Sequence, residues 1–186
     1  YGLADYKVVG HVVRFSHQKN HDLLVDIFAE LYSQDDTYRL MLIGDGTLRA
    51  EIERKVQDLG LKDAVMFMGR TTEVPQLLQA MDVLVMPSRY EGLPLSLIEA
   101  QAACLQCVVS DAITREVALT ELVTFASLTD PPLTWAEKIV MATLHDRYGR
   151  KDEVLRKITD SGYSIRNLAD RLKNTYFDLV SDIKAK

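Results

Sequence analysis

The sequence lacks the features that mark several large classes of protein. No apolar run among its 186 residues approaches the ~18 residues of a membrane-spanning helix, and no secretory signal opens the chain. Only two cysteines are present, which indicates a reducing compartment and a fold that needs no disulfides. Acidic residues outnumber basic ones, 27 to 22, and the net charge of −5 argues against nucleic acid or an anionic membrane as a partner. We therefore expect a cytoplasmic, globular protein.

Common motifs of nucleotide and metal binding are absent as well. Gly44-Asp45-Gly46 begins like a dinucleotide fingerprint, but the third glycine would fall at Arg49. There is no Walker A sequence, and the four histidines lack metalloprotease spacing. Cys104-Leu105-Gln106-Cys107 has no second ligand pair for zinc, and it follows a predicted helix, whereas redox pairs start one. We interpret both cysteines as small buried residues and expect no metal site.

Apolar runs alternating with helical patterns fill most of the chain. Hydrophobic residues make up 47% of it, and the strand-like runs are continuously apolar, which is typical of strands buried on both faces. We predict an α/β fold, a doubly wound parallel sheet with helices on both faces, as one domain over residues 1–186 that ends in a helix over about 164–186. The predicted strands are 8–13, 40–43, 64–68, 83–86, 107–110 and 122–126.

The most informative stretch is residues 87–100, a turn that leads from the fourth predicted strand into a helix. Pro94 suits the first position of this helix, and Leu93 before it has no side-chain oxygen that could cap the helix. This leaves three N–H groups without an obvious local partner, those of Leu95, Ser96 and Leu97. The Ser96 hydroxyl is the one side-chain group nearby that could contact them. An uncapped helix start beside a glycine is suited to binding an anion.

Two carboxylates, Glu91 and Glu99, bracket this helix start. On a helix their backbones would be ~12 Å apart at 1.5 Å per residue, which fits poorly with the ~5–10 Å between the carboxyl groups of glycosidases. A carboxylate also accepts two hydroxyl hydrogen bonds well, so each glutamate could hold the diol of a sugar or ribose. The alternative for Glu99 is an ordinary surface position, although its largely apolar neighbours favour a role.

Two cations, Arg14 and Lys19, follow the first predicted strand, and Asn20 after them could cap the next helix. The arginine fork and the lysine point charge together suit a diphosphate, whereas each residue alone could equally be a solvated loop cation. Parallel strands end at one edge of a sheet, where ligands of such folds bind. The residues expected at that edge are Arg14, Lys19, Gly44, Gly69, Arg70 and Glu91. Their convergence favours the diphosphate.

The order of these pieces resembles the C-terminal, donor-binding half of retaining glycosyltransferases of the GT-B type (group 1, family 4-like), which include many bacterial polysaccharide enzymes. The segments that carry the resemblance are Arg14-Phe15-Ser16-His17-Gln18-Lys19-Asn20-His21, Leu42-Ile43-Gly44-Asp45-Gly46, Val65-Met66-Phe67-Met68-Gly69-Arg70, and Pro87-Ser88-Arg89-Tyr90-Glu91-Gly92-Leu93-Pro94 through Glu99-Ala100. The last segment is the most specific, because it contains the family's pattern of two glutamates separated by seven residues. The resemblance implies a Rossmann-like domain of a two-domain enzyme whose N-terminal acceptor domain is absent here.

This resemblance also implies a role for each site residue. Arg14 and Lys19 would hold the donor diphosphate, and Glu91 would contact the transferred sugar, so that these three form the catalytic set. Glu99 would accept hydrogen bonds from the ribose hydroxyls. The residues that would lie near the base are Gly69, Arg70 and Val74. The segment that would support sugar and phosphate, through its amides other than that of the proline, is Gly92, Leu93, Pro94, Leu95 and Ser96.

The implied activity is transfer of a hexose from a nucleotide-diphosphate sugar, preferably a UDP-sugar, to a glycan or lipid-linked acceptor in polysaccharide biosynthesis. No metal would be needed, because cationic side chains and a helix dipole neutralise the leaving diphosphate. The expected partners are this donor and the N-terminal acceptor domain, through which the enzyme could associate peripherally with the cytoplasmic face of a membrane. The isolated chain should bind the donor but transfer little or no sugar.

Three positions depart from the family pattern. Val13 stands where a glycine usually precedes the arginine, and its methyl groups could crowd a phosphate. Cys104 and Gln106 stand where glycine and proline are usual. Val13 leaves open a non-catalytic or regulatory nucleotide-sugar-binding module, and a GT-B-type sugar-nucleotide epimerase shares the same architecture. A signalling receiver ranks last, because it would need an acidic cluster after the first strand.

Overall fold

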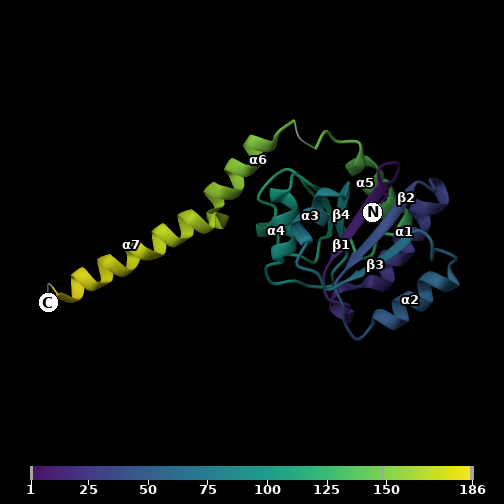
Figure 1. Ribbon diagram of the computed structural model, residues 1–186, viewed down its shortest axis with the longest axis horizontal. Coiled ribbons are helices and arrows are strands. Elements are labelled where there is room, and N and C mark those ends of the chain that lie inside the picture. The colour runs from purple at the N-terminus through teal and green to yellow at the C-terminus, as the bar shows by residue number, and fades with distance from the viewer. Residues whose placement is uncertain (1, 148, 185–186) are drawn as a thin grey trace.

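Six parallel strands form one sheet in the computed structural model, which describes residues 2–147 and 149–184 (Figure 1). Their order across the sheet is β3-β2-β1-β4-β5-β6, and each neighbouring pair is parallel. The strands are β1 (Lys7–Val12), β2 (Tyr38–Ile43), β3 (Val65–Gly69), β4 (Val83–Met86), β5 (Gln106–Ser110) and β6 (Val123–Ala126). The predicted doubly wound parallel sheet is confirmed. Its strand order reverses between β1 and β4, where ligands of such folds bind.

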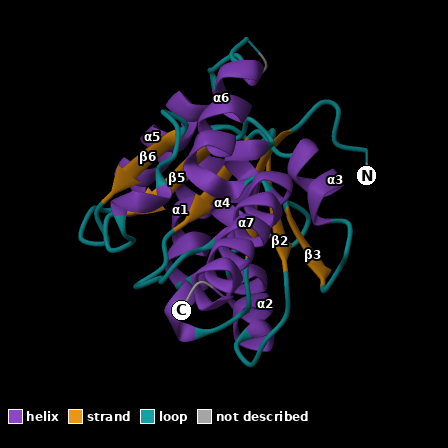
Figure 2. Cartoon of the chain, turned by 90° about the vertical axis from the view of Figure 1, so that its left-hand side faces the viewer, coloured by secondary structure: helices purple, strands orange, loops and turns teal. Residues whose placement is uncertain are grey.

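Helices cover both faces of the sheet (Figure 2). They are α1 (His21–Gln34), α2 (Arg49–Asp58), α3 (Val74–Gln79), α4 (Leu95–Ala102), α5 (Pro132–Thr143), α6 (Lys151–Ile158) and α7 (Ile165–Lys184). Side chains of α1, α2 and α5 share one core cluster, and those of α3 and α4 share a second. Successive strand residues enter opposite clusters, as Val9 and Val8 of β1 do. Both sets must therefore be apolar, which explains the continuous apolar runs in the sequence.

Helix α4 is followed, two residues after its end, by a residue in the left-handed conformation. The amides of Cys104 and Leu105 donate to the carbonyls of Gln101 and Ala100, at 2.8 and 2.9 Å, and Cys104 has φ 58°. Glycine is usual at this position because a Cβ crowds the backbone there. Cys104 occupies it with its side chain buried against Ile98. Both cysteines are buried and free, as predicted.

The C-terminal helices attach to the domain very differently. Val154 and Ile158 of α6 pack against α4 in a small core cluster, whereas α7 runs away from the sheet (Figure 1). Every α7 side chain that the structure describes is exposed. Large apolar side chains recur on it at helical spacing, at Ile165, Leu168, Leu172 and Tyr176. Within residues 2–147 and 149–184, no helix is both long enough and apolar enough to cross a bilayer.

Candidate functional site

Two loops meet at the carboxyl ends of β1 and β4. The backbone N–H of Arg89 donates to the carbonyl of Gln18, and the Gln18 side chain donates to the carbonyl of Tyr90, both at 2.8 Å. The Arg89 guanidinium donates to the Asn20 side-chain oxygen at 3.0 Å. These bonds join the loop after β1 (residues 13–20) to the loop after β4 (residues 87–94) at the point where the strand order reverses.

This arrangement corrects the expected role of Asn20. Asn20 does stand immediately before α1, but it has φ 56° and makes no side-chain hydrogen bond to the helix start. Its amide oxygen accepts from Arg89 instead. The capping interaction is lost because a left-handed residue does not have the extended backbone of an ordinary N-cap.

Lys19 and Glu91, two of the predicted site residues, form an ion pair across the two loops. The Lys19 ammonium lies 2.6 and 2.7 Å from the two carboxylate oxygens of Glu91. The lysine side chain is 17% exposed and the glutamate side chain is 6% exposed, so water screens the pair weakly. An ammonium group has three donors, and the pair uses two of them. One donor of Lys19 therefore remains available for a ligand at the rim.

The start of α4 lies directly beyond Glu91 and differs from the prediction at two residues. Pro94 is the residue before the helix, with an extended ψ of 97°, and is not its first helical residue. Because its carbonyl accepts from the N–H of Leu97 at 3.0 Å, that amide is not free. The amides of Leu95 and Ser96 have no partner among the described residues, and no side chain caps the helix. Two N–H groups thus remain available to an anion.

Arg14 extends from the end of β1 into solvent. It is exposed and has no hydrogen-bond or ion-pair partner within the described part of the chain. Val13 before it is half-buried, and its side chain packs against the core cluster beneath α3 and α4. The Val13 methyl groups thus have core neighbours, which weakens the argument that this residue displaces a phosphate.

Gly44, after β2, explains how closely the neighbouring loop can approach. Its φ of +134° suits glycine alone, and a Cβ added there would lie 2.0 Å from the Val13 carbonyl oxygen. Its amide donates to the carbonyl of Gly69, at the end of β3, at 2.8 Å. Gly44 therefore joins the rims of three strands without any dinucleotide fingerprint.

The residues expected near a base lie farther along the same rim. Gly69 ends β3, Arg70 is exposed after it, and Val74 begins α3. An open hollow of about 510 Å³ is lined by Arg70, Thr71, Thr72 and Glu73. No direct contact joins this group to the pair of Lys19 and Glu91 within the described residues.

Glu99 lies beside α3, the helix that begins at Val74. It is exposed on α4 and lines a hollow of about 300 Å³ together with residues of α3, among them Pro75 and Leu78. Its backbone carbonyl accepts from the amide of Ala103, but its carboxylate has no hydrogen-bond or ion-pair partner among the described residues. Its carboxylate is therefore available to hydroxyl groups of a ligand.

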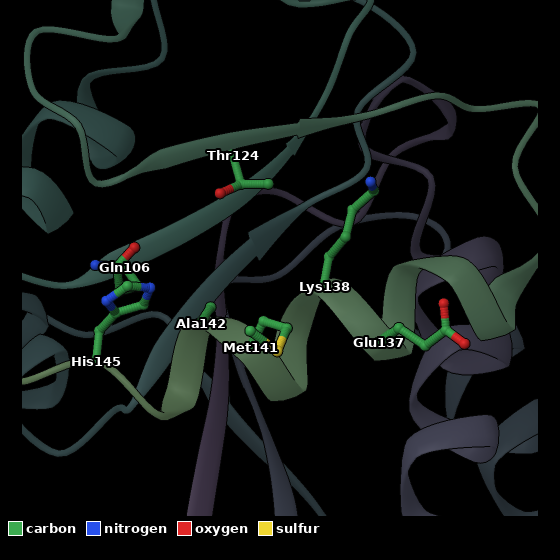
Figure 3. Close-up of a pocket in the computed structure, with 7 residues that line it drawn as sticks. All are labelled: Gln106, Thr124, Glu137, Lys138, Met141, Ala142 and His145. Carbon is green, nitrogen blue, oxygen red and sulfur yellow. The ribbon is translucent and has the colours of Figure 1, made fainter.

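A third hollow lies away from this rim. It has a volume of about 210 Å³ and is lined by residues of β5, β6 and α5, among them Gln106 and Lys138, and by His145 after α5 (Figure 3). Gln106 is the first residue of β5, so the hollow lies at the amino end of that strand. Ligands of doubly wound folds bind at the opposite, carboxyl ends, and no predicted site residue lines this hollow. Within residues 2–147 and 149–184, no group of three or more His, Cys, Asp or Glu side chains could share a metal ion.

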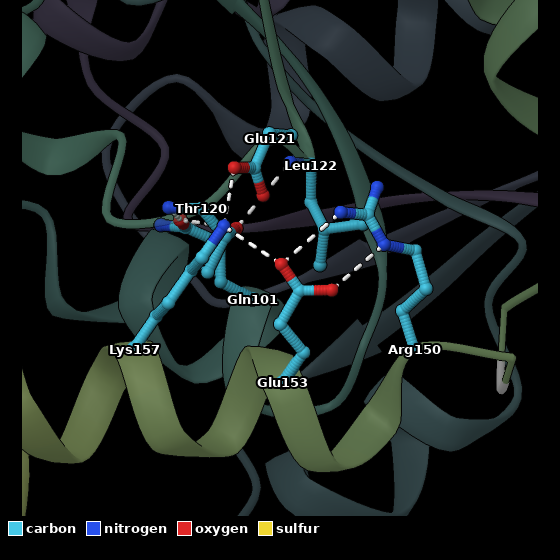
Figure 4. A network of polar contacts seen from close by, with 7 residues as sticks. All are labelled: Gln101, Thr120, Glu121, Leu122, Arg150, Glu153 and Lys157. Atoms are coloured by element: carbon cyan, nitrogen blue, oxygen red, sulfur yellow. Dashed lines mark hydrogen bonds and ion pairs between the residues drawn. The ribbon is translucent and has the colours of Figure 1, made fainter.

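A polar network around α6 has a structural role. Glu153 pairs with Lys157 and Arg150, both at 3.0 Å, and Lys157 also pairs with Glu121 (Figure 4). Beside it, the buried Gln101 side chain accepts from the amide and hydroxyl of Thr120 at 3.1 and 3.0 Å. These bonds hold α6 and the approach to β6 against α4.

Sequence reasoning missed Gln18 and Arg89, which hold the two loops together. Both are polar residues in predicted loops, and nothing local distinguishes them from solvated ones. It also missed His11 and His21, which are buried at 1% and 2% exposure. A histidine within the apolar run of β1 was the one available signal.

Comparisons with known proteins agree with this architecture. Residues 2–140 match the family model described as "Glycosyl transferases group 1". EpsF of Bacillus subtilis, which is named as a glycosyltransferase, is 39% identical over 174 residues, which cover 93% of this chain and 45% of EpsF.

Solved structures show the same fold. A variant of Staphylococcus aureus TarM, solved in complex with fondaparinux, alpha-GlcNAc-glycerol and UDP, is similar with a TM-score of 0.78 and 23% identity, over 91% of this chain and 35% of TarM. The C-terminal domain of LpcC from Francisella tularensis, a glycosyl transferase group 1 family protein, is similar with a TM-score of 0.69 and 21% identity, over 86% of this chain and 87% of that domain. This chain thus spans less than half the length of EpsF and of TarM.

Proposed function

Because the chain belongs to the group 1 glycosyl transferases, we propose that it is the donor-binding half of a retaining enzyme that transfers a hexose from a UDP-sugar to a glycan or lipid-linked acceptor in polysaccharide biosynthesis. One observation carries the proposal: Lys19 and Glu91 pair beside the two unpartnered amides at the start of α4. A cation, an acid and free backbone donors at a strand-order reversal suit the diphosphate and sugar of such a donor.

In the proposed reaction, the bond between the sugar C1 and the diphosphate oxygen breaks, a bond forms between C1 and the acceptor oxygen, and the proton of the acceptor hydroxyl passes to the leaving diphosphate. Negative charge develops on the leaving diphosphate. The free donor of Lys19, the exposed guanidinium of Arg14 and the amides of Leu95 and Ser96 neutralise this charge in place of a metal ion. Glu91 contacts the transferred sugar.

The nucleoside part of the donor lies, in this proposal, along the rim from β4 towards β3. Glu99 accepts the ribose hydroxyls, and Gly69, Arg70 and Val74 surround the base. The open hollow beside Arg70 and the free carboxylate of Glu99 support this placement. UDP in the TarM structure supports uracil as the base.

The acceptor would be bound by an N-terminal domain in the remainder of a longer chain. The share of EpsF and TarM that this chain covers supports such a second half, and so does the exposed apolar stripe of α7. The isolated chain would then bind the donor without appreciable transfer. Cytoplasmic location, and membrane association through the second half, stay predictions from the sequence.

Calorimetric titration of the chain with UDP, GDP and ADP tests the proposal. We expect UDP to bind most tightly, and Lys19→Ala or Arg14→Ala to weaken UDP binding about tenfold or more by removing a charge-assisted contact. Lys7→Ala is a matched control, because the Lys7 ammonium also pairs with a carboxylate, that of Asp35 at 2.8 Å, but at the start of β1, on the edge of the sheet opposite the rim. Absence of binding to all three nucleotides at millimolar concentration would contradict the proposal.

A further inference from the structure

Two buried histidines flank the loop that carries Arg14 and Lys19. His11 lies on β1, and His21 is the first residue of α1. Three of their four ring nitrogens have no hydrogen-bond partner among the described residues, namely His11 Nε2 and both nitrogens of His21. Burying an unpaired polar atom costs free energy, so another property of these rings must favour them here.

The rings form a continuous stack with Phe15. His21 stacks on Phe15 with ring centroids 4.1 Å apart, and His11 meets His21 edge-on at 4.7 Å. His11 Nδ1 donates to the carbonyl of Val85 on β4 at 2.7 Å. The stack therefore joins β4, β1 and both ends of the loop, since Phe15 follows Arg14 and His21 lies two residues after Lys19.

Phe15 is itself held by the loop after β2. Its amide donates to the Asp45 carbonyl at 3.0 Å. A Cβ at Gly46 would lie 2.2 Å from the Phe15 carbonyl oxygen, so the two backbones are in close contact. The Arg14 end of the loop is thus held on one side by backbone contacts and on the other by the His21 ring.

The two rings must stay neutral for this arrangement to hold. Burial, aided by the nearby Lys19 charge, lowers the pKa of His11 to about 4 and that of His21 to about 2. A proton on either ring would place a second buried cation near the Lys19 ammonium.

We propose that His11 and His21 are positioning residues, which through their stack with Phe15 fix the loop of residues 13–20 so that Lys19 and Arg14 are held ready for the donor diphosphate. The proposal rests on the proposed function for its ligand, but the order of the loop can be measured without any ligand. A flexible loop would lose conformational entropy each time it bound the ligand. Because the stack already orders the loop, this cost is reduced.

The test compares the loop in three variants of the chain. His21→Ala removes the ring, His21→Leu fills its volume without a ring, and His21→Phe keeps a ring without nitrogens. Amide hydrogen exchange over residues 13–20, without nucleotide, should accelerate in the first two variants and stay near wild type in the third. Val25→Ala is the control, because it removes methyl groups from a fully buried position on the same helix; it should leave exchange at residues 13–20 unchanged.

Affinity for UDP provides the second measurement. We expect His21→Ala to weaken UDP binding about tenfold, His21→Phe to restore most of it, and Lys19→Ala to add little further loss in the His21→Ala background. If wild type fails to bind UDP, the proposed function is wrong, but hydrogen exchange at residues 13–20 still tests whether the stack orders the loop. Unchanged exchange at residues 13–20 in His21→Leu, or acceleration equal to that in Val25→Ala, would overturn the positioning role.

Discussion

The ammonium of Lys19 lies within 2.7 Å of both carboxylate oxygens of Glu91, although 72 residues separate the two in the sequence. This pair is largely buried, and it joins the loop after β1 to the loop that leads into α4. The two bonds leave one lysine donor for the proposed diphosphate. The pair thus contributes both to loop structure and to the charge of the site.

The Lys19–Glu91 pair should show strong energetic coupling. Removing one partner leaves the other buried and uncompensated, so Lys19→Met and Glu91→Gln should each lower the free energy of unfolding by about 2–3 kcal/mol. The double variant should lose less than the sum, with coupling above about 1 kcal/mol in urea denaturation. Lys7 and Asp35, whose ion-paired side chains are 47% and 33% exposed, should couple by less than about 1 kcal/mol. Additive losses at Lys19 and Glu91 would contradict the expectation.

Gly44→Ala should destabilise the domain far more than the same change at Gly60. Both glycines have positive φ, but a Cβ at Gly44 would lie 2.0 Å from the Val13 carbonyl, whereas nothing lies within 4 Å at Gly60. We expect Gly60→Ala to cost about 1 kcal/mol from backbone strain alone. Gly44→Ala should cost more than about 3 kcal/mol, because the neighbouring backbone must also move. Thermal unfolding of the two variants measures the difference, and equal losses would show that the loops can separate freely.

Stability should fall as the pH drops below 6.5 because of the buried histidines. Folding lowers the pKa of His11 from 6.5 to about 4 and that of His21 to about 2. The unfolded chain therefore binds protons first, and each histidine should reduce the free energy of unfolding by about 1.4 kcal/mol per pH unit once the pH is well below 6.5. Urea denaturation between pH 6.5 and about 5 avoids most carboxylate titration.

Variants identify the source of this pH dependence. His21→Phe should flatten the slope between pH 6.5 and about 5 because it removes one of the two groups that the fold keeps neutral. His145→Gln, at an exposed histidine after α5, is the control and should leave the slope unchanged. An identical slope in His21→Phe and wild type would contradict the assignment.

Removing α7 should leave the stability of the isolated domain nearly unchanged. Each described side chain of this helix is exposed, with Ile165 at 85%, so little apolar area is lost from the core when residues 165–186 are deleted. Melting temperatures of the full and shortened chains should agree, and the shortened chain should self-associate less because the apolar stripe is gone. A marked fall in melting temperature would show that α7 packs on the domain.

Local patterns in the sequence were sufficient for the architecture. Continuous apolar runs such as Val83–Met86 can be buried only between two helical layers, and this follows from composition and spacing alone. The sequence also predicted the edge of the sheet at which Lys19, Arg70 and Glu91 lie, because the carboxyl ends of parallel strands all lie on one side. These inferences need only the order of the elements along the chain.

Contacts between distant loops required the folded chain. The pairing of Lys19 with Glu91, the bond between Arg89 and Asn20 and the stack of His21 on Phe15 each join residues of different loops or elements. Hydrophobic periodicity carries no information about such contacts, because they depend on β1 lying beside β4 and on how closely glycine lets two backbones approach. The layers of this protein are thus encoded locally, whereas its candidate site arises from the packing of the whole sheet.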